Sequence, residues 1–148
     1  MPYATAQDIV DLYGADFLLL IARRGDENDL SGPLTSAAIE DALAQASSQA
    51  DSYIGARYPV PVQPVPMVLQ RAVIDMACHQ LAATADVMTE QIRQRYEDAL
   101  AWLKDVAGGR AALGTDEAGA AAGDAAAGGN PDEALIASRE PVDWRRWP

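Results

Sequence analysis

The chain has 148 residues, with 22 Asp and Glu against 11 Lys and Arg, and its net charge at pH 7 is -11. This acidic balance argues against a protein that grips nucleic-acid phosphates, because such proteins need clustered Lys and Arg. The single cysteine, Cys78, excludes an internal disulfide and a multi-cysteine zinc site, and no apolar run reaches the roughly 18 residues of a membrane span.

The N-terminal third of the chain predicts amphipathic helices. Thr5 has the character of an N-cap with Asp8 at capping-box spacing, and the helix that it begins breaks at Gly14 before it resumes. After a polar loop, Thr35 or Ser36 is the predicted cap of a longer helix. The apolar face of that helix recurs at helical spacing and consists of Ile39, Leu43, Ala46, Ala50, Tyr53 and Ile54.

Residues 51–66 (DSYIGARYPVPVQPVP) contain the end of this longer helix and then four prolines. The prolines predict an extended crossover that cannot be helical. The next helix is predicted from Met67 to about Ala83. It is apolar nearly all the way round, which predicts a position at the centre of a bundle. Its polar stripe consists of Arg71, Asp75 and His79.

The last predicted helix begins at Thr89 and ends at two glycines, Gly108 and Gly109. Arg93 and Glu97 stand at the spacing of an exposed ion pair on it. Its predicted buried face consists of Ile92, Tyr96, Ala99, Leu100, Leu103 and Val106.

The fold class that follows is all-α: a small bundle of four to five helices with a proline-rich crossover and an extended, low-complexity C-terminal arm. Residues 1–114 are the predicted helical domain, and residues 115–130, rich in Ala and Gly, are a predicted flexible linker. Residues 131–148 are a predicted docking arm, because aromatic and Arg side chains make strong anchors at interfaces. The anchor residues of this arm are Leu135, Ile136, Trp144, Arg145, Arg146 and Trp147.

An acidic side chain on the central helix needs a partner if it is buried, because an unpaired buried charge is costly. We expect Asp75 to pair with Arg57 from the end of the preceding helix, or with Arg71 one turn away. In a second interpretation, the stripe that contains Asp75 faces a neighbouring copy and sets the register of an oligomer.

No catalytic constellation stands out. Motifs for phosphate-binding loops, nucleophile elbows and zinc-protease helices are absent from the sequence. Cys78 and His79 are adjacent, and adjacent side chains on a helix point about 100° apart, so they do not form a dyad. The acidic run 26–29 fails as a calcium loop at Leu30. The sequence therefore predicts no enzyme activity, no cofactor and no metal.

The order of these landmarks resembles a family of Mu-like phage and prophage proteins. The segments MPYATAQDIVDLYG, DSYIGARYPVPV, VPMVLQRAVIDMACHQL and RYEDALAWLKDVAGGRAALG carry the resemblance, which covers roughly residues 2–114. That family is in turn similar to the head-to-tail connector, or adaptor, proteins of long-tailed phages. Residues 115–148 lie outside the resemblance.

The resemblance implies a virion structural protein of the neck, made in the host cytoplasm, that forms a ring with the twelve-fold symmetry of the portal and leaves a channel for DNA. The implied partners are other copies of the chain, the portal protein and the next neck or tail-terminator protein, with DNA only as passing cargo and no membrane. The alternatives are a head-completion or tail-terminator protein, which is expected to be rich in strands, and an accessory phage protein that is absent from the particle.

Overall fold

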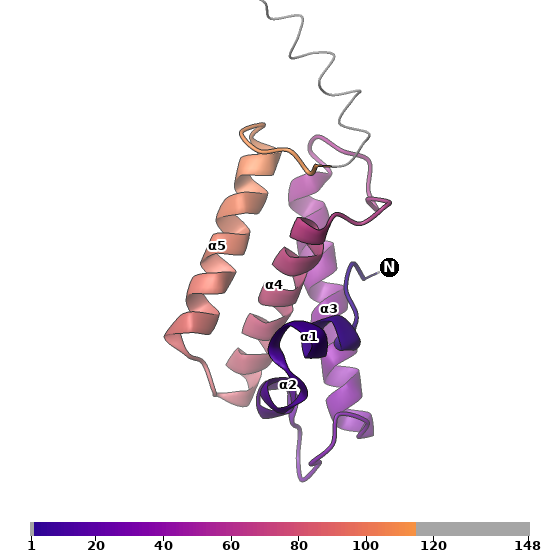
Figure 1. Cartoon of the computed structure of the whole chain (residues 1–148), viewed down its shortest axis with the longest axis vertical. Coiled ribbons are helices and arrows are strands. Elements are labelled where there is room, and N and C mark those ends of the chain that lie inside the picture. Colours follow the sequence, from indigo (N-terminus) through magenta and orange to yellow (C-terminus); the bar gives the residue numbers. More distant parts are fainter. Residues whose placement is uncertain (1, 115–148) are drawn as a thin grey trace, which may run out of the picture. The chain divides into compact units, whose positions relative to one another are not determined.

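The computed structural model describes residues 2–114, which contain five α-helices and no β-strand (Figure 1). The long helices α3, α4 and α5 run side by side, and the two short helices cross in front of α3 and α4 in this view. The all-α class and the helix count are therefore confirmed, while the predicted linker and arm lie outside the described residues. The helices are α1 (Ala6–Tyr13), α2 (Ala15–Ala22), α3 (Pro33–Ile54), α4 (Met67–Ala85) and α5 (Glu90–Ala107).

Local capping chemistry determines where α1 and α5 begin. The Thr5 hydroxyl accepts a hydrogen bond from the Asp8 amide at 3.3 Å, and the Asp8 carboxylate accepts one from the Thr5 amide at 2.7 Å, so the predicted capping box is formed. Gly14 separates α1 from α2 with a φ of 93°, a conformation that favours glycine. Thr89 caps α5 by accepting a hydrogen bond from the Ile92 amide at 3.2 Å.

The predicted cap of α3 is wrong. The helix begins at Pro33, and the orphan amides of its first turn are satisfied from the preceding loop: the Glu27 carboxylate accepts hydrogen bonds from the Leu34 amide at 3.1 Å and the Thr35 amide at 2.7 Å. Thr35 is buried, and its hydroxyl accepts a hydrogen bond from the Arg24 amide at 3.3 Å. Proline is well placed at a helix start because it lacks the amide that would need a partner.

Helix α4 lies at the centre of the bundle, as predicted. It contacts α2, α3 and α5, and it ends at Ala85, two residues later than expected. On α5 the apolar face is buried at Ile92, Ala99, Leu103 and Val106, whereas Tyr96 and Leu100 are half-buried. Arg93 pairs with Glu90 rather than with the predicted Glu97.

Tyr3 ties the N-terminus to the proline-rich crossover. Its side chain is 4% exposed, its hydroxyl donates to the Asp51 carboxylate near the end of α3, and the same oxygen accepts a hydrogen bond from the Val62 amide at 3.0 Å. The Tyr3 amide also donates to the Ser47 hydroxyl at 3.0 Å. Tyr3 therefore links α3 to the crossover that leads into α4.

Candidate interaction surfaces

Asp75, in the middle of the polar stripe of α4, is buried and accepts a hydrogen bond from the hydroxyl of Tyr13 at the end of α1. The Arg95 guanidinium from α5 lies over the Tyr13 ring, 4.4 Å from its centre. Burial raises the pKa of Asp75, and the Tyr13 hydrogen bond and the nearby Arg71 act in the opposite direction. Burial and the bond to Asp75 raise the pKa of Tyr13 to about 12. This cluster joins three helices.

The predicted pairing of Arg57 with Asp75 is wrong. Arg57 lies beyond the end of α3, in the turn that leads to the crossover, and its guanidinium donates to the Val106 carbonyl at 3.3 Å. That carbonyl belongs to the last turn of α5, where unsatisfied carbonyls and the helix dipole favour a cation. Arg71 is exposed and does not hydrogen-bond Asp75, so the tyrosine takes the place that was expected for an arginine.

Cys78 and His79 do not cooperate chemically. Cys78 is buried, and burial raises the pKa of its thiol to about 12, so the reactive thiolate is strongly disfavoured. His79 stacks on the Tyr96 ring of α5 with ring centres 3.9 Å apart, and burial lowers its pKa. Both side chains serve helix packing.

The acidic loop before α3 has a structural task. Glu27 caps α3, and the Asp29 carboxylate accepts hydrogen bonds from the amide and the hydroxyl of Ser31.

Within residues 2–114, no group of three or more His, Cys, Asp or Glu side chains could hold a metal ion. No helix in the same part of the chain is long and apolar enough to cross a membrane.

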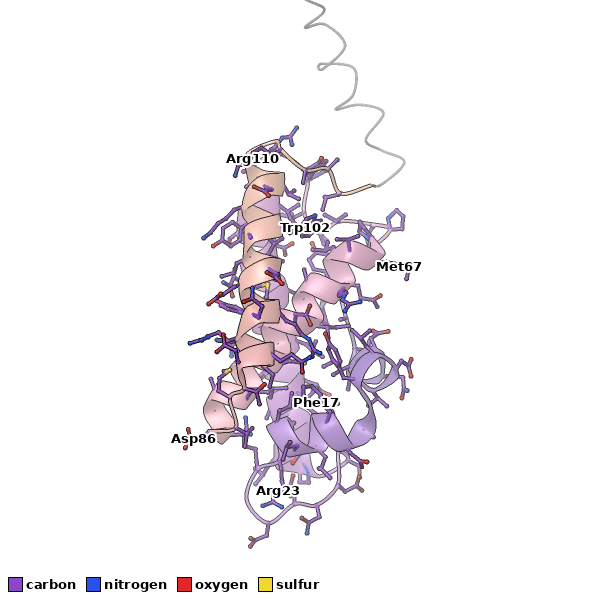
Figure 2. The ribbon with its side chains drawn as sticks, turned by 60° about the vertical axis from the view of Figure 1, so that its left-hand side comes forward. Phe17, Arg23, Met67, Asp86, Trp102 and Arg110 are labelled. Atoms are coloured by element: carbon purple, nitrogen blue, oxygen red, sulfur yellow. The ribbon has the colours of Figure 1, made fainter. Side chains whose placement is uncertain are left out.

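A groove of about 440 Å³ lies between α1 and the first half of α4, and we call it the α1–α4 groove. Three of its apolar side chains are exposed: Met67 is 84%, Val68 55% and Leu12 39% exposed. Figure 2 shows the Met67 side chain pointing away from the bundle. The complete lining is Asp8, Asp11, Leu12, Met67, Val68, Gln70, Arg71 and Ile74.

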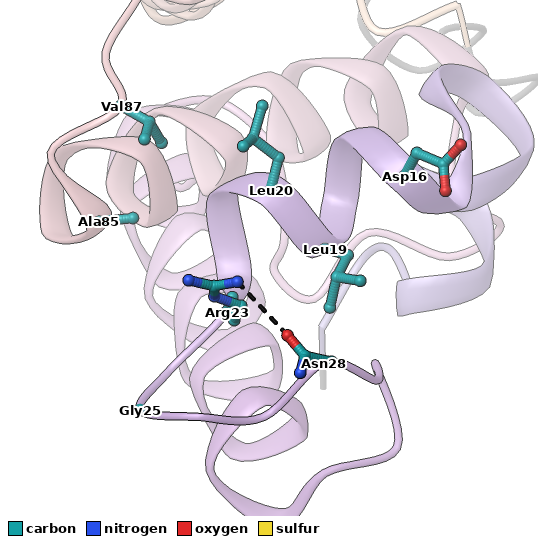
Figure 3. Close-up of a pocket in the computed structure, with 8 residues that line it drawn as sticks. All are labelled: Asp16, Leu19, Leu20, Arg23, Gly25, Asn28, Ala85 and Val87. Carbon is teal, nitrogen blue, oxygen red and sulfur yellow. Dashed lines mark hydrogen bonds between the residues drawn. The ribbon is translucent and has the colours of Figure 1, made fainter.

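A second pocket, of about 490 Å³, lies beside α2 at the opposite end of α4, and we call it the α2 pocket (Figure 3). Leu20, on its wall, is 63% exposed, and Arg23 donates to the Asn28 side chain across the mouth at 3.4 Å. Leu19, Ala85 and Val87 supply further apolar lining, and Asp16 and Gly25 complete it.

The anchor residues of the predicted arm, from Leu135 to Trp147, lie outside the described residues. Sequence reasoning did not identify either surface, since both are built from residues distant along the chain. The sequence feature that could have indicated them is the excess of apolar residues in α4, which includes Met67 and Val68 directly after Pro66.

Comparison with known proteins identifies relatives among phage proteins. Residues 3–129 match the family described as "Bacteriophage Mu, Gp36". The "Mu-like prophage FluMu protein gp36" of Haemophilus influenzae is 34% identical over 115 residues, which cover 78% of this chain and 77% of that protein. "Gene product J" of Escherichia phage Mu is 33% identical over 121 residues, 82% of each chain.

Proposed function

This chain belongs to the bacteriophage Mu Gp36 family, and we propose that it is a structural virion protein, a head-to-tail connector. In this proposal, copies of the chain form a ring below the portal and join the capsid to the tail around a channel for DNA. Its partners are other copies of itself, the portal protein and the next neck protein. It acts by assembly and not as an enzyme.

The observation that carries the proposal is the exposure of large apolar side chains at both ends of α4. Met67 and Val68 are exposed at its start, and Leu20 is exposed beside the α2 pocket at its end. At 1.5 Å per residue, the length of α4 separates the two surfaces by about 27 Å. A ring of identical subunits needs surfaces that contact its neighbours, and two separate apolar surfaces give each copy places for such contacts.

Two further features support a connector over its alternatives. Residues 2–114 are helical, whereas the tail-terminator alternative is expected to be rich in strands. The net charge of -11 also suits the wall of a channel, because DNA that passes acidic side chains is repelled and does not stick.

The proposal is tested by deleting the gene from the phage and imaging the products by negative-stain electron microscopy. We expect DNA-filled heads and complete tails that remain unjoined, and a plasmid copy of the gene restores whole particles. Mass spectrometry of purified wild-type particles is expected to detect the protein. Joined particles that lack the protein would overturn the proposal.

The two surfaces are tested by substitution in the same complementation assay. Val68→Asp and Leu20→Asp each place a charge on one apolar surface, and we expect both to prevent the joining of heads to tails. Ser48→Asp, on the exposed polar side of α3, is the matched control and is expected to restore particles. Circular dichroism and thermal unfolding check that all three variants remain folded.

A further inference from the structure

The α1–α4 groove combines exposed apolar side chains with two carboxylates, those of Asp8 and Asp11. Of the seven large apolar side chains exposed in residues 2–114, three line it: Leu12, Met67 and Val68. Its volume, about 440 Å³, lies in the range of roughly 300–1,000 Å³ in which proteins hold small ligands or anchoring side chains. Surfaces of this kind are covered by a partner in the functional assembly.

The two carboxylates of the groove can accept hydrogen bonds from a cation. Asp8 uses one carboxylate oxygen in the capping box, and Asp11 uses one to accept a hydrogen bond from the Gln7 side chain at 2.8 Å. Each carboxylate therefore has a second oxygen without a partner among the described residues. Arg71 stands on the α4 side of the same groove, so one positive charge faces the two negative ones.

The C-terminal segment has the complementary chemistry. Residues 139–148, REPVDWRRWP, contain two tryptophans for an apolar groove and Arg145 and Arg146 for the carboxylates of Asp8 and Asp11. Asp143 precedes the two arginines, and its negative charge would suit Arg71. Trp and Arg are also the residue types that most often dominate binding energy at protein interfaces.

We propose that residues 139–148 of one subunit occupy the α1–α4 groove of the neighbouring subunit, with Trp144 and Trp147 against its exposed apolar side chains. This inference rests on the proposed ring. The arm and the groove are two different surfaces that bind each other, which is what a contact between successive subunits of a ring requires. The contact would bury the apolar side chains that a single chain leaves exposed.

The geometry permits the contact. The segment after α5, in which the described residues end, lies at the same end of the bundle as the crossover and the start of α4 (Figure 1). About thirty residues separate Gly114 from Trp144, and a chain of that length spans at most roughly 100 Å. A domain of this size has a diameter of about 35 Å. The groove of a neighbour is therefore within reach.

The test uses disulfide cross-linking of the full-length chain. Two variants, Val68→Cys and Pro148→Cys, are purified separately, mixed and oxidised gently, so that a bond between them can form only between two chains. Pro148 follows Trp147 directly, so both tryptophans are kept. The native Cys78 is buried at 3% exposure and is not expected to react. We expect a cross-linked heterodimer, whereas Ser48→Cys mixed with Pro148→Cys is expected to give none.

A charge-reversal series tests the two carboxylates of the groove. Adding Arg145→Glu and Arg146→Glu to the Pro148→Cys chain is expected to lower the cross-linking yield about threefold to tenfold, the scale of losing one or two exposed ion pairs. Asp11→Lys on the groove side is expected to restore part of that loss. Asp11 is chosen because Asp8 also caps α1.

Several outcomes would overturn the inference. One is a yield no higher than that of the Ser48→Cys control. Another is a chain carrying Val68→Cys and Pro148→Cys together that forms only an intramolecular disulfide, since the arm then covers its own groove. If these results occur while the gene deletion still leaves heads and tails unjoined, the arm contact is wrong and the connector function stands.

Discussion

Removing the hydroxyl of Tyr3 should loosen the crossover that positions the start of α4. In Tyr3→Phe the ring still fills its site, but the Val62 amide loses its acceptor and the Asp51 carboxylate loses a donor. Val62 is 6% exposed, so water cannot easily replace the lost bond. An unsatisfied buried amide costs about 1–3 kcal/mol, and a bond to a charged group contributes about 1.5–3 kcal/mol, reduced here by partial exposure. We expect the free energy of unfolding to fall by about 2–3 kcal/mol.

Urea unfolding followed by circular dichroism measures this change, and a melting curve should show a fall of roughly 8–12 °C for a domain of this size. Tyr53→Phe is the matched control, because the Tyr53 ring packs on the core and its hydroxyl has no hydrogen-bond partner among residues 2–114. It should change stability by less than about 0.5 kcal/mol. A Tyr3→Phe variant as stable as this control would refute the assignment of Tyr3 as the clasp.

Three further predictions concern other buried groups. Asp75→Asn keeps an oxygen that can accept the Tyr13 hydrogen bond and removes a buried charge, so stability at pH 7 should stay unchanged or rise by about 1 kcal/mol. Because the pKa of Asp75 is raised in the folded state, protonation stabilises the folded wild type. The difference in free energy of unfolding between the wild type and Asp75→Asn, measured by urea titration, should therefore narrow as the pH falls toward 3.8. The pKa values of Tyr3 and Tyr13 are raised to about 12, so the folded state should lose stability as pH rises from 10 through 12, which tyrosinate absorbance and circular dichroism can follow together. Leu103→Ala, at a fully buried position on α5, should cost about 2–5 kcal/mol in chemical denaturation, whereas Ala101→Gly on the exposed side should cost about 1 kcal/mol.

The sequence predicts best the parts of the fold that depend on residues within about one helical turn of each other. Thr5 and Asp8 are three residues apart and form their capping box whatever the rest of the chain does. Gly14 likewise breaks a helix by its own backbone freedom. The burial of α4 on most of its circumference follows from its apolar composition.

Most of the wrong predictions concern contacts between distant residues; the exception is Arg93, which pairs with Glu90 instead of Glu97 on the same helix. A helical projection places Asp75 on a stripe, but it does not say which element faces that stripe, and the partner is Tyr13, 62 residues earlier. The pairing predicted for Arg57 places it at the end of the helix before the crossover, whereas α3 ends at Ile54 and the Arg57 guanidinium bonds to Val106, 49 residues later. The cap of α3 comes from Glu27, outside the helix.

The exposed start of α4 connects the composition of that helix to assembly. A helix that is apolar nearly all the way round predicts cover on every side. In the single chain α2, α3 and α5 supply that cover, but Met67 and Val68 in the first turn stay exposed. Full burial of either side chain in a contact would stabilise the assembly by roughly 1.5–3 kcal/mol. That free energy becomes available when another surface covers the turn, so the same apolar excess that places α4 at the centre of the bundle also favours a contact between subunits.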